Sequence, residues 1–318
     1  MEPMLRFVGI DVSKAHLDVA SRPDGREFRL PNSPEGIASL VDRLKASPPT
    51  LILLEATGGF EWAAAVALVE AGMPIRIVEP GRVRHFARSI GQHSKTDAID
   101  ARVLAHYAEA VRPEARDLPD EKTRDLQALL DRRRQLVTMR VSEENRRRQG
   151  PTAAVRAGLE SHIAYLNEQV AQIDKSIGEK IEADPEWKLR DEVLRSVPGV
   201  GDQTSRTLLG LLPEIGSLTG KQVAALAGLA PRARDSGTVS GARTIFGGRA
   251  DVRTALSMAA LSAMRHNPEL RAFYQRLRKA GKAAKVAITA VSRKLLTIVN
   301  AMIRDMKPWE LKMTATAT

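Results

Sequence analysis

Four carboxylate side chains have the spacing and surroundings expected of a catalytic or metal-binding set. Asp11 lies within the apolar segment FVGIDV, and Glu55 ends the apolar run TLILLE. A carboxylate in such a segment is costly to bury unless it is paired or binds a cation. Asp97 and Asp100 are three residues apart at the start of a predicted helix, which places both on one face.

Convergence of these four acids would create a site for divalent cations. So many negative charges cannot share one site unless cations neutralise them. Ligation by oxygen alone favours Mg²⁺ or Mn²⁺. Two such ions about 4 Å apart can activate a nucleophile and stabilise the leaving oxygen when a phosphodiester is cleaved. The set therefore predicts metal-dependent phosphoryl transfer.

Each acid also has a simpler interpretation. Asp97 fits a helix N-terminus, where a negative charge is favoured. Asp100 fits a surface position, and Glu55 fits a turn cap before the Gly-rich segment TGG. The acid inside the first strand is the hardest to explain in this way. Two further acids, Asp18 and Glu61, are interpreted as surface residues and stand outside the set.

Residues 1–111 have the element order of an RNase H-like α/β domain. The predicted strands cover residues 6–12, 16–22, 26–30, 50–54 and 75–78. The predicted helices begin at Ser33-Pro34 and cover residues 60–71, 82–90 and about 96–110. If the first and fourth strands are adjacent and the last helix packs across them, the four carboxylates converge.

Residues 112–185 predict two long helices separated at Gly150-Pro151. The second carries a heptad seam with spacings of 4, 4, 3, 4, 3 and 4, formed by Val155, Leu159, Ile163, Leu166, Val170, Ile173 and Ile177. This pattern favours an antiparallel helical hairpin or an intermolecular coiled coil. The first helix carries Arg132, Arg133, Arg146 and Arg147. Because the segment has no net charge, these arginines fit phosphate contact or a solvated face equally well.

The positive charge of the chain is concentrated in its last third. The 318 residues hold 49 Lys and Arg against 38 Asp and Glu, a formal net charge of +11. Residues 1–111 carry 13 basic and 14 acidic residues, residues 112–185 carry 14 of each, and residues 186–318 carry 22 and 10. A basic domain attracts polyanions, of which nucleic acid is the commonest in a cell. We therefore interpret residues 186–318 as a helical nucleic-acid-binding domain rather than a surface charged only for solubility.

Composition excludes several classes of protein. The absence of cysteine excludes disulfide frameworks, zinc fingers, iron–sulfur centres and thiol nucleophiles. Aromatic residues make up only 4%, which disfavours aromatic base-stacking platforms. Charged or polar residues interrupt the apolar stretches before the roughly 18 residues of a membrane span, and the N-terminus lacks a signal-peptide layout. The expectation is a cytoplasmic protein associated with the nucleoid.

Several separated motifs resemble those of a known family. The segments GIDVSK, LLEATGG and KTDAIDARVLA are similar to the RuvC-like DEDD domain of IS110-family insertion-sequence transposases, to which Piv-type DNA invertases are related. The segments VPGVG and LAGLAPRARDSGTVSGARTIFGGRADVRTAL resemble that family's second transposase domain. The resemblance spans nearly the whole chain. It implies Mg²⁺-dependent transposition or recombination guided by a bridge RNA, with a serine of the second domain completing the active site.

The resemblance places that serine at Ser236, in the segment RDSG. A hydroxyl in a basic loop can be presented to a scissile phosphate, and nearby arginines can stabilise the developing charge. Ser240 competes for this role, and either serine also fits a simple turn. The arginines expected to contact nucleic acid here are Arg232, Arg234, Arg243 and Arg253. Many relatives carry Tyr where this chain has Ser257, and the segment FGG replaces a more basic stretch.

The sequence thus predicts a transposase or recombinase that cuts and rejoins DNA strands. Its expected partners are donor and target DNA, a structured non-coding RNA, and further copies of the chain, as a dimer or tetramer, through the heptad seam. One alternative is a structure-selective nuclease of the Holliday-junction resolvase type, in which water is the nucleophile. Another is a non-catalytic RNA-binding scaffold, against which the intact carboxylate set argues.

Overall fold

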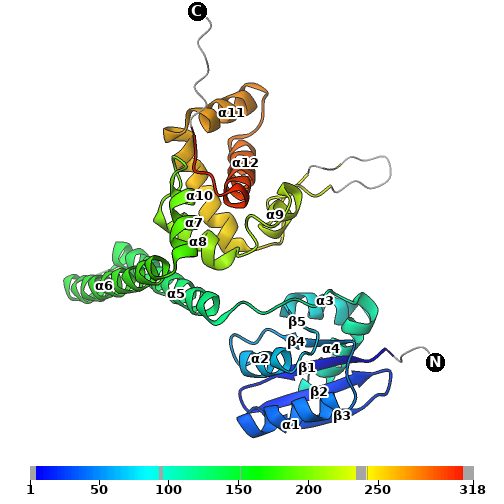
Figure 1. The fold of residues 1–318 in the computed structure, drawn as a ribbon. Coiled ribbons are helices and arrows are strands. Elements are labelled where there is room, and N and C mark those ends of the chain that lie inside the picture. The colour runs from blue at the N-terminus through cyan, green and yellow to red at the C-terminus, as the bar shows by residue number, and fades with distance from the viewer. Residues whose placement is uncertain (1–4, 93–95, 151, 234–240, 242, 311–318) are drawn as a thin grey trace, which may run out of the picture. The chain divides into compact units, whose positions relative to one another are not determined.

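The chain divides into two units by its internal contacts, Met1–Pro119 and Asp120–Thr318 (Figure 1). The computed structural model describes residues 5–92, 96–150, 152–233, 241 and 243–310, without the side chains of Asp97 and Ala98. The helical hairpin and the basic helices, predicted as separate domains, fall in the same unit. The division into three domains therefore stays a prediction.

A mixed five-stranded sheet forms the centre of the N-terminal unit, in the order β3-β2-β1-β4-β5. Strands β1, β2 and β3 are antiparallel neighbours, whereas β4 and β5 run parallel to β1. The strands are β1 Phe7–Val12, β2 His16–Arg22, β3 Glu27–Pro31, β4 Leu51–Glu55 and β5 Ile75–Val78. The five predicted strands are confirmed, in the element order expected of an RNase H-like domain.

Helices cover both faces of this sheet. They are α1 Pro34–Lys45, α2 Trp62–Glu70, α3 Pro80–Ser89 and α4 Asp97–Val111. Alternate strand residues explain the two layers, because Val8 and Ile10 share a core with α1 and α2, whereas Phe7 and Leu53 share a core with α3 and α4. Ser33 and Thr96 cap α1 and α4, each with its side-chain oxygen accepting from a backbone N–H.

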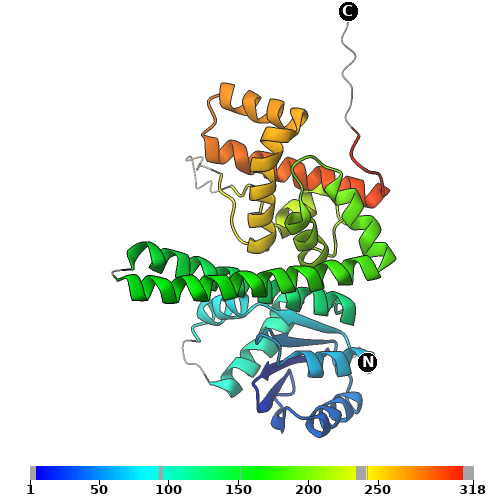
Figure 2. The same ribbon diagram turned by 90° about the vertical axis from the view of Figure 1, so that its left-hand side faces the viewer.

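The C-terminal unit begins with the predicted helical hairpin, α5 Glu121–Gln149 and α6 Ala153–Ala183 (Figure 2). From Ile163 onward the heptad seam faces the chain itself, since Leu166 and Val170 pack with Leu136 of α5 and Ile177 joins the core of the unit. Val155, at the start of the seam, is exposed. The seam from Ile163 to Ile177 is therefore used within the hairpin, and the expected contact between copies through it is wrong for that stretch.

The remaining helices pack around one apolar core. They are α7 Pro185–Arg195, α8 Asp202–Leu211, α9 Gly220–Leu226, α10 Ala250–His266, α11 Pro268–Lys279 and α12 Ala284–Asp305. Contrary to the sequence expectation, α12 is long and apolar enough to cross a membrane by length and composition. Its residues Leu295, Leu296 and Val299 are fully buried in this core. A core helix passes the same test, so the feature is weak evidence for a membrane span.

Candidate functional site

Asp11 and Glu55 come together at the carboxyl ends of two adjacent parallel strands. The register pairs Gly9 with Leu53 and Ile10 with Leu54, so the next step along the strands places Asp11 beside Glu55. Neighbouring strands lie about 4.8 Å apart, and paired residues project from the same face. Both carboxylates are half-buried on the face covered by α3 and α4.

Gly9 allows α4 to approach that face closely. A Cβ at Gly9 would overlap backbone atoms of Ala101 and Ala105, so only a glycine fits between the strand and the helix. Ala20, the cross-strand neighbour of Gly9, packs with Ala101 and Ala105 as well. The small residues of this contact therefore fix α4 directly over β1 and β2.

Two ion pairs give the direction of α4 along the sheet. Glu109 Oε2 lies 2.5 Å from Arg22 Nε, at the level of the start of β1. Arg102 Nε lies 3.6 Å from Glu27 Oε1, two strand positions further along. The helix therefore runs antiparallel to β1, and its first turn, residues 97–100, extends toward the level of Asp11. Packing of this helix across β1 is one condition for the four carboxylates to converge.

The structure tests the four-carboxylate set only in part. Asp100 is half-buried in the first turn of α4, and the side chain of Asp97 lies outside the described residues. Among the side chains that the structure describes, no three of His, Asp or Glu lie close enough together to hold a metal ion. The donor types suit Mg²⁺ or Mn²⁺, and Asp11 with Glu55 supplies two adjacent donors. The complete metal site stays a prediction.

Asp18 is buried rather than exposed, which corrects the sequence interpretation. It is 6% exposed, lies directly across from Asp11, and accepts a 2.8 Å hydrogen bond from Arg29 of β3. The alternation in β2 suggested one solvated face, but α4 covers that face. Asp18 thus adds a fixed negative charge beside Asp11, and Arg29 offsets it.

Glu61 is also buried, at 4% exposure, and has a clear structural role. Its carboxylate accepts hydrogen bonds from the Thr57 backbone N–H, the Thr57 hydroxyl and the Gly59 N–H, at 2.9–3.1 Å. Gly58 and Gly59 adopt positive φ angles of 80° and 127°. Glu61 therefore fixes the loop that follows Glu55, a role that local spacing in the sequence could have suggested.

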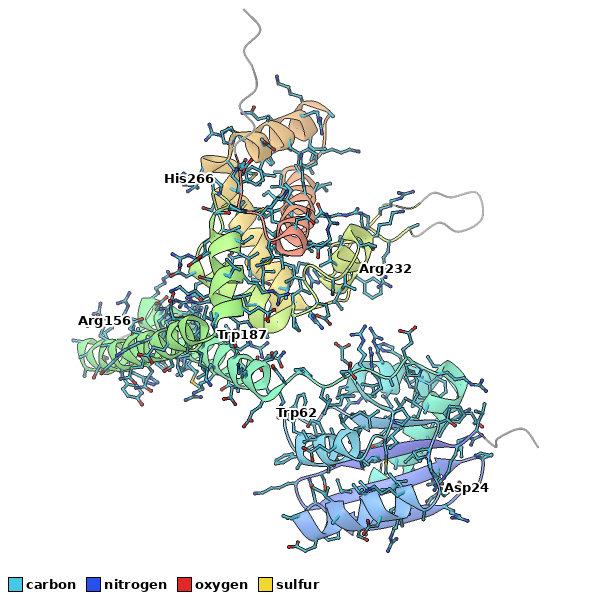
Figure 3. All side chains as sticks on the ribbon, in the orientation of Figure 1. Asp24, Trp62, Arg156, Trp187, Arg232 and His266 are labelled. Atoms are coloured by element: carbon cyan, nitrogen blue, oxygen red, sulfur yellow. The ribbon has the colours of Figure 1, made fainter. Side chains whose placement is uncertain are left out.

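In the C-terminal unit, the segment that contains Ser236 starts and ends at a short backbone bridge. The Arg232 N–H donates to Thr244 O at 2.9 Å, and the Thr244 N–H donates back to Arg232 O at 3.2 Å. The Arg232 guanidinium stacks 4.4 Å from the centre of the Phe246 ring, beyond the end of α9 (Figure 3). Ser236, Ser240 and Arg234 lie outside the described residues.

The arginines predicted to contact nucleic acid fall into two groups. Arg133 is held by Asp174 at 2.6 and 3.1 Å, and Arg253 donates to the Gly247 carbonyl at 2.6 Å. Those with exposed side chains are Arg132, Arg146, Arg147, Arg232 and Arg243. The first group is engaged within the fold. The second is exposed to solvent, and within it Arg146 also pairs with Glu143 at 2.7 Å.

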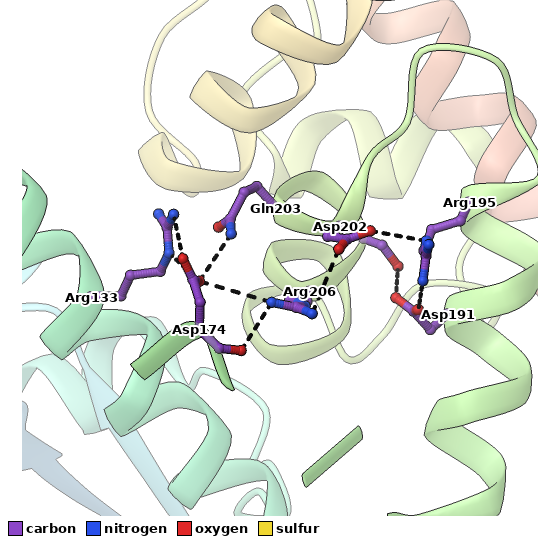
Figure 4. Close-up of polar contacts among 8 residues, drawn as sticks. Arg133, Asp174, Asp191, Arg195, Asp202, Gln203 and Arg206 are labelled. Carbon is purple, nitrogen blue, oxygen red and sulfur yellow. Dashed lines mark hydrogen bonds and ion pairs between the residues drawn. The ribbon is translucent and has the colours of Figure 1, made fainter. Parts of the chain in front are cut away.

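An ion-pair network ties the hairpin to α7 and α8 (Figure 4). Asp174 accepts from Arg133 and Gln203, while Arg206 bonds its backbone carbonyl and lies 3.7 Å from Asp202. Burial would raise the pKa of Asp174, but the hydrogen bonds from Arg133 and Gln203 and the guanidinium charges outweigh it and lower that pKa below its usual value.

The Gly-rich turn at residues 197–201, of a type that can bring backbone N–H groups close to a phosphate, is packed into the core. Val197 and Val200 are buried, and a Cβ at Gly199, whose φ is 105°, would overlap the backbone of Ala263 in α10. The next residue, Asp202, places a carboxylate in the first turn of α8 and pairs with Arg195 at 3.0 Å. The close contact with Ala263 explains why residue 199 is a glycine. The Asp202 carboxylate places a negative charge where a phosphate would bind.

Comparison with known proteins identifies both parts of the chain. Residues 8–150 match the DEDD IS110 family, described as transposase, and residues 191–275 match the family described as transposase IS116/IS110/IS902. The chain thus carries two transposase domains of the IS110 family. The first match contains the carboxylate edge, and the second contains the segment around Ser236. The chain is accordingly an enzyme of DNA transposition or recombination.

Full-length relatives agree with this transposase assignment. The chain is 29% identical to a pilin gene-inverting protein of Moraxella lacunata, over 96% of this chain and 98% of the relative. It is 25% identical to an uncharacterized 43.6 kDa protein of insertion element IS110 from Streptomyces coelicolor, over 97% and 96%. Among solved structures it is similar to Thermus thermophilus RuvC, at 17% identity and a TM-score of 0.26, over 35% of this chain and 99% of RuvC.

Proposed function

We propose that this transposase cuts and rejoins DNA through a serine nucleophile and a carboxylate-held divalent cation. The nucleophile is Ser236, and the residues that hold Mg²⁺ or Mn²⁺ are Asp11, Glu55, Asp97 and Asp100. The observation that chiefly supports this is the match of both transposase domains in one chain and in order. The adjacency of Asp11 and Glu55, with α4 running toward them, supports the carboxylate half.

The serine and its neighbours perform the covalent step in this proposal. The Ser236 Oγ attacks the scissile phosphorus, a phosphoserine bond forms, and the displaced strand oxygen leaves as a hydroxyl group. A hydroxyl of the strand to be joined then attacks the same phosphorus and releases the serine. The exposed Arg232 and Arg243, with Arg234, offset the phosphate charge. When bound, a divalent cation neutralises the phosphate and lowers the barrier to attack.

A trapping experiment tests the nucleophile. A DNA substrate nicked beside the cleavage site should leave a denaturant-resistant protein–DNA adduct with the unmodified enzyme and none with Ser236→Ala. Ser240→Ala is the matched control and should still form the adduct. Cleavage at a normal rate by Ser236→Ala would mean that water is the nucleophile, as in a resolvase. Loss of the adduct in Ser240→Ala alone would move the nucleophile to that serine.

The proposal extends to partners. We propose that a structured non-coding RNA guides the reaction and that two or four copies assemble on donor and target DNA in the bacterial cytoplasm. The charge of residues 186–318 supports polyanion binding. The hairpin residues Met139, Val155 and Tyr165 are about half exposed and offer apolar contact area between copies. Strand exchange in the absence of any RNA transcribed from the flanking non-coding DNA would contradict the proposed guidance by RNA.

A further inference from the structure

A cavity of about 750 Å³ lies in the C-terminal unit beside the bridge between Arg232 and Thr244. One wall comes from the chain on both sides of that bridge, through Leu229, Pro231 and Ile245. The opposite wall is α12, and Phe273 of α11 closes one side. This volume is in the range of pockets that bind small organic groups.

Most of the α12 side chains that line the cavity are polar or charged, and packing of the helix in the core does not account for them. Its lining residues recur at helical spacing and are Lys285, Val286, Thr289, Ala290, Arg293, Lys294 and Thr297. They lie away from the core residues Val291, Leu295 and Val299. The helix therefore has two specialised faces, one apolar and buried in the core and one that combines cations, hydroxyls and short apolar groups.

Among the described residues that line the cavity, four are cations and none is an acid. They are Arg243, Lys285, Arg293 and Lys294. None of the four forms an ion pair with a carboxylate of the described part of the chain. Most cations of α5 to α8, by contrast, do form one. The Lys294 ammonium lies 4.7 Å from the centre of the Phe273 ring, which holds this half-buried charge in place. Such a lining has the charge complement of a phosphate group.

The lining between these cations, the floor of the cavity, is formed by apolar residues such as Val286 and Ala290. The uncharged polar groups beside it are threonine hydroxyls. The hydroxyls of Thr289 and Thr297 donate to carbonyls of their own helix at 2.9 and 2.8 Å. Their oxygens are therefore left as acceptors, suited to the amino group of a base. A flat heterocycle with apolar faces and polar edges, attached to phosphates, matches both the floor and the rim of the cavity.

We infer that this cavity receives one unpaired nucleotide of the nucleic acid on which the transposase acts, with its base on the apolar floor and its phosphates against the rim. The inference rests on the proposed function, because it takes a nucleic-acid substrate as given. Extruding a base costs least where it is already unpaired, so the pocket would select distorted or single-stranded positions. The low aromatic content is compatible with this mode, since aliphatic side chains supply the floor.

The test measures preference for an unpaired nucleotide with the full-length chain. Fluorescence anisotropy would compare a perfect 20-mer duplex with the same duplex carrying one bulged nucleotide, in DNA and in RNA versions. We expect tighter binding to the bulged form by about tenfold, the scale of one base contact. The version with the larger preference identifies the strand type.

Two variants and a matched control test whether the preference for the bulged duplex arises from the cavity. Ala290→Phe fills the floor of the cavity. It should abolish the preference for the bulged over the perfect duplex, while binding to the perfect duplex persists. Lys285→Gln with Arg293→Gln should weaken binding to the bulged form and lower its salt slope by about two. Lys279→Gln with Lys282→Gln makes the same charge change outside the lining and should leave the preference intact.

The outcomes separate this inference from the proposed function. An unchanged preference in both cavity variants, or equal binding to bulged and perfect duplexes by the unmodified chain, would overturn the inference whatever the catalytic result. Ser236→Ala should keep the preference while losing the covalent adduct. A preserved preference without any adduct from the unmodified enzyme would leave the cavity assignment standing and would contradict the serine mechanism.

Discussion

The carboxylate edge of the N-terminal unit and the basic cavity of the C-terminal unit are built in opposite ways. Asp11 and Glu55 project from adjacent strands under a helix that Gly9 admits to close contact. Arg293 and Lys285 instead extend from one helix on long side chains over an apolar floor. Bond-making chemistry requires groups at fixed positions, whereas phosphate attraction tolerates movement of the charge. The rigid region is therefore the candidate for catalysis and the adaptable region for binding.

The largest expected effect tests the rigid region. Asp11→Asn and Glu55→Gln should each lower strand exchange by about a thousandfold or more, because each removes an anionic ligand of the proposed metal site. DNA binding by the C-terminal unit should persist in both, measured by anisotropy alongside a strand-exchange assay. Asp18→Asn provides the contrast, since it removes the charge across from Asp11 that Arg29 already pairs. Strand exchange near the normal rate in either ligand variant would remove that residue from the set.

The next effect tests whether close packing of α4 positions the acids. Gly9→Ala should lower the free energy of unfolding by about 3 kcal/mol, since its Cβ would overlap the backbone of Ala101 and Ala105. Gly81→Ala is the matched control, because nothing lies within 4 Å of a Cβ there. Denaturant unfolding of both variants is the measurement. Equal stability of the two would contradict the close approach of helix and strand.

A smaller effect concerns a charge that serves structure rather than binding. Asp174→Asn should cost about 2 kcal/mol at pH 7, because it leaves Arg133 without its carboxylate partner and removes one of the two carboxylates near Arg206. The folded pKa of Asp174 is lowered, so its contribution is complete above the unfolded value near 4 and is lost as pH falls through the folded value. Unfolding curves of the two proteins should therefore converge below about pH 4. A constant difference down to pH 2 would assign the effect to something other than ionisation.

The smallest effect distinguishes an arginine held by a carboxylate from an exposed arginine. Arg147→Gln should reduce nucleic-acid affinity a few-fold and lower the salt slope by about one, without a change in stability. Arg133→Gln should instead lower stability, because Arg133 makes two hydrogen bonds to Asp174. Thermal melting and salt-dependent anisotropy of both variants provide the comparison. A loss of binding in Arg133→Gln that matches the loss in Arg147→Gln would erase the distinction.

Local patterns in the sequence determined most of the secondary structure. Ser33 with Pro34 and Thr96 with Asp97 predicted the starts of α1 and α4, and both caps are present. The unbroken apolar run before Glu55 predicted a buried strand, and Gly150 ends the first helix of the hairpin. Caps, breakers and periodicity act between residues a few positions apart, so one sequence is enough to show them.

Tertiary structure alone decided what lies beside what. The neighbours of Asp11, which are Asp18 and Glu55, depend on the pairing of three strands, and the burial of Asp18 depends on α4, some 80 residues later in the chain. The heptad seam fits an intermolecular coiled coil equally well until α5 is seen to occupy it. The second face of α12 has a partner only because residues 229–231 and 243–245 line the same cavity. These outcomes come from contacts between segments far apart in sequence, whose energies no local pattern contains.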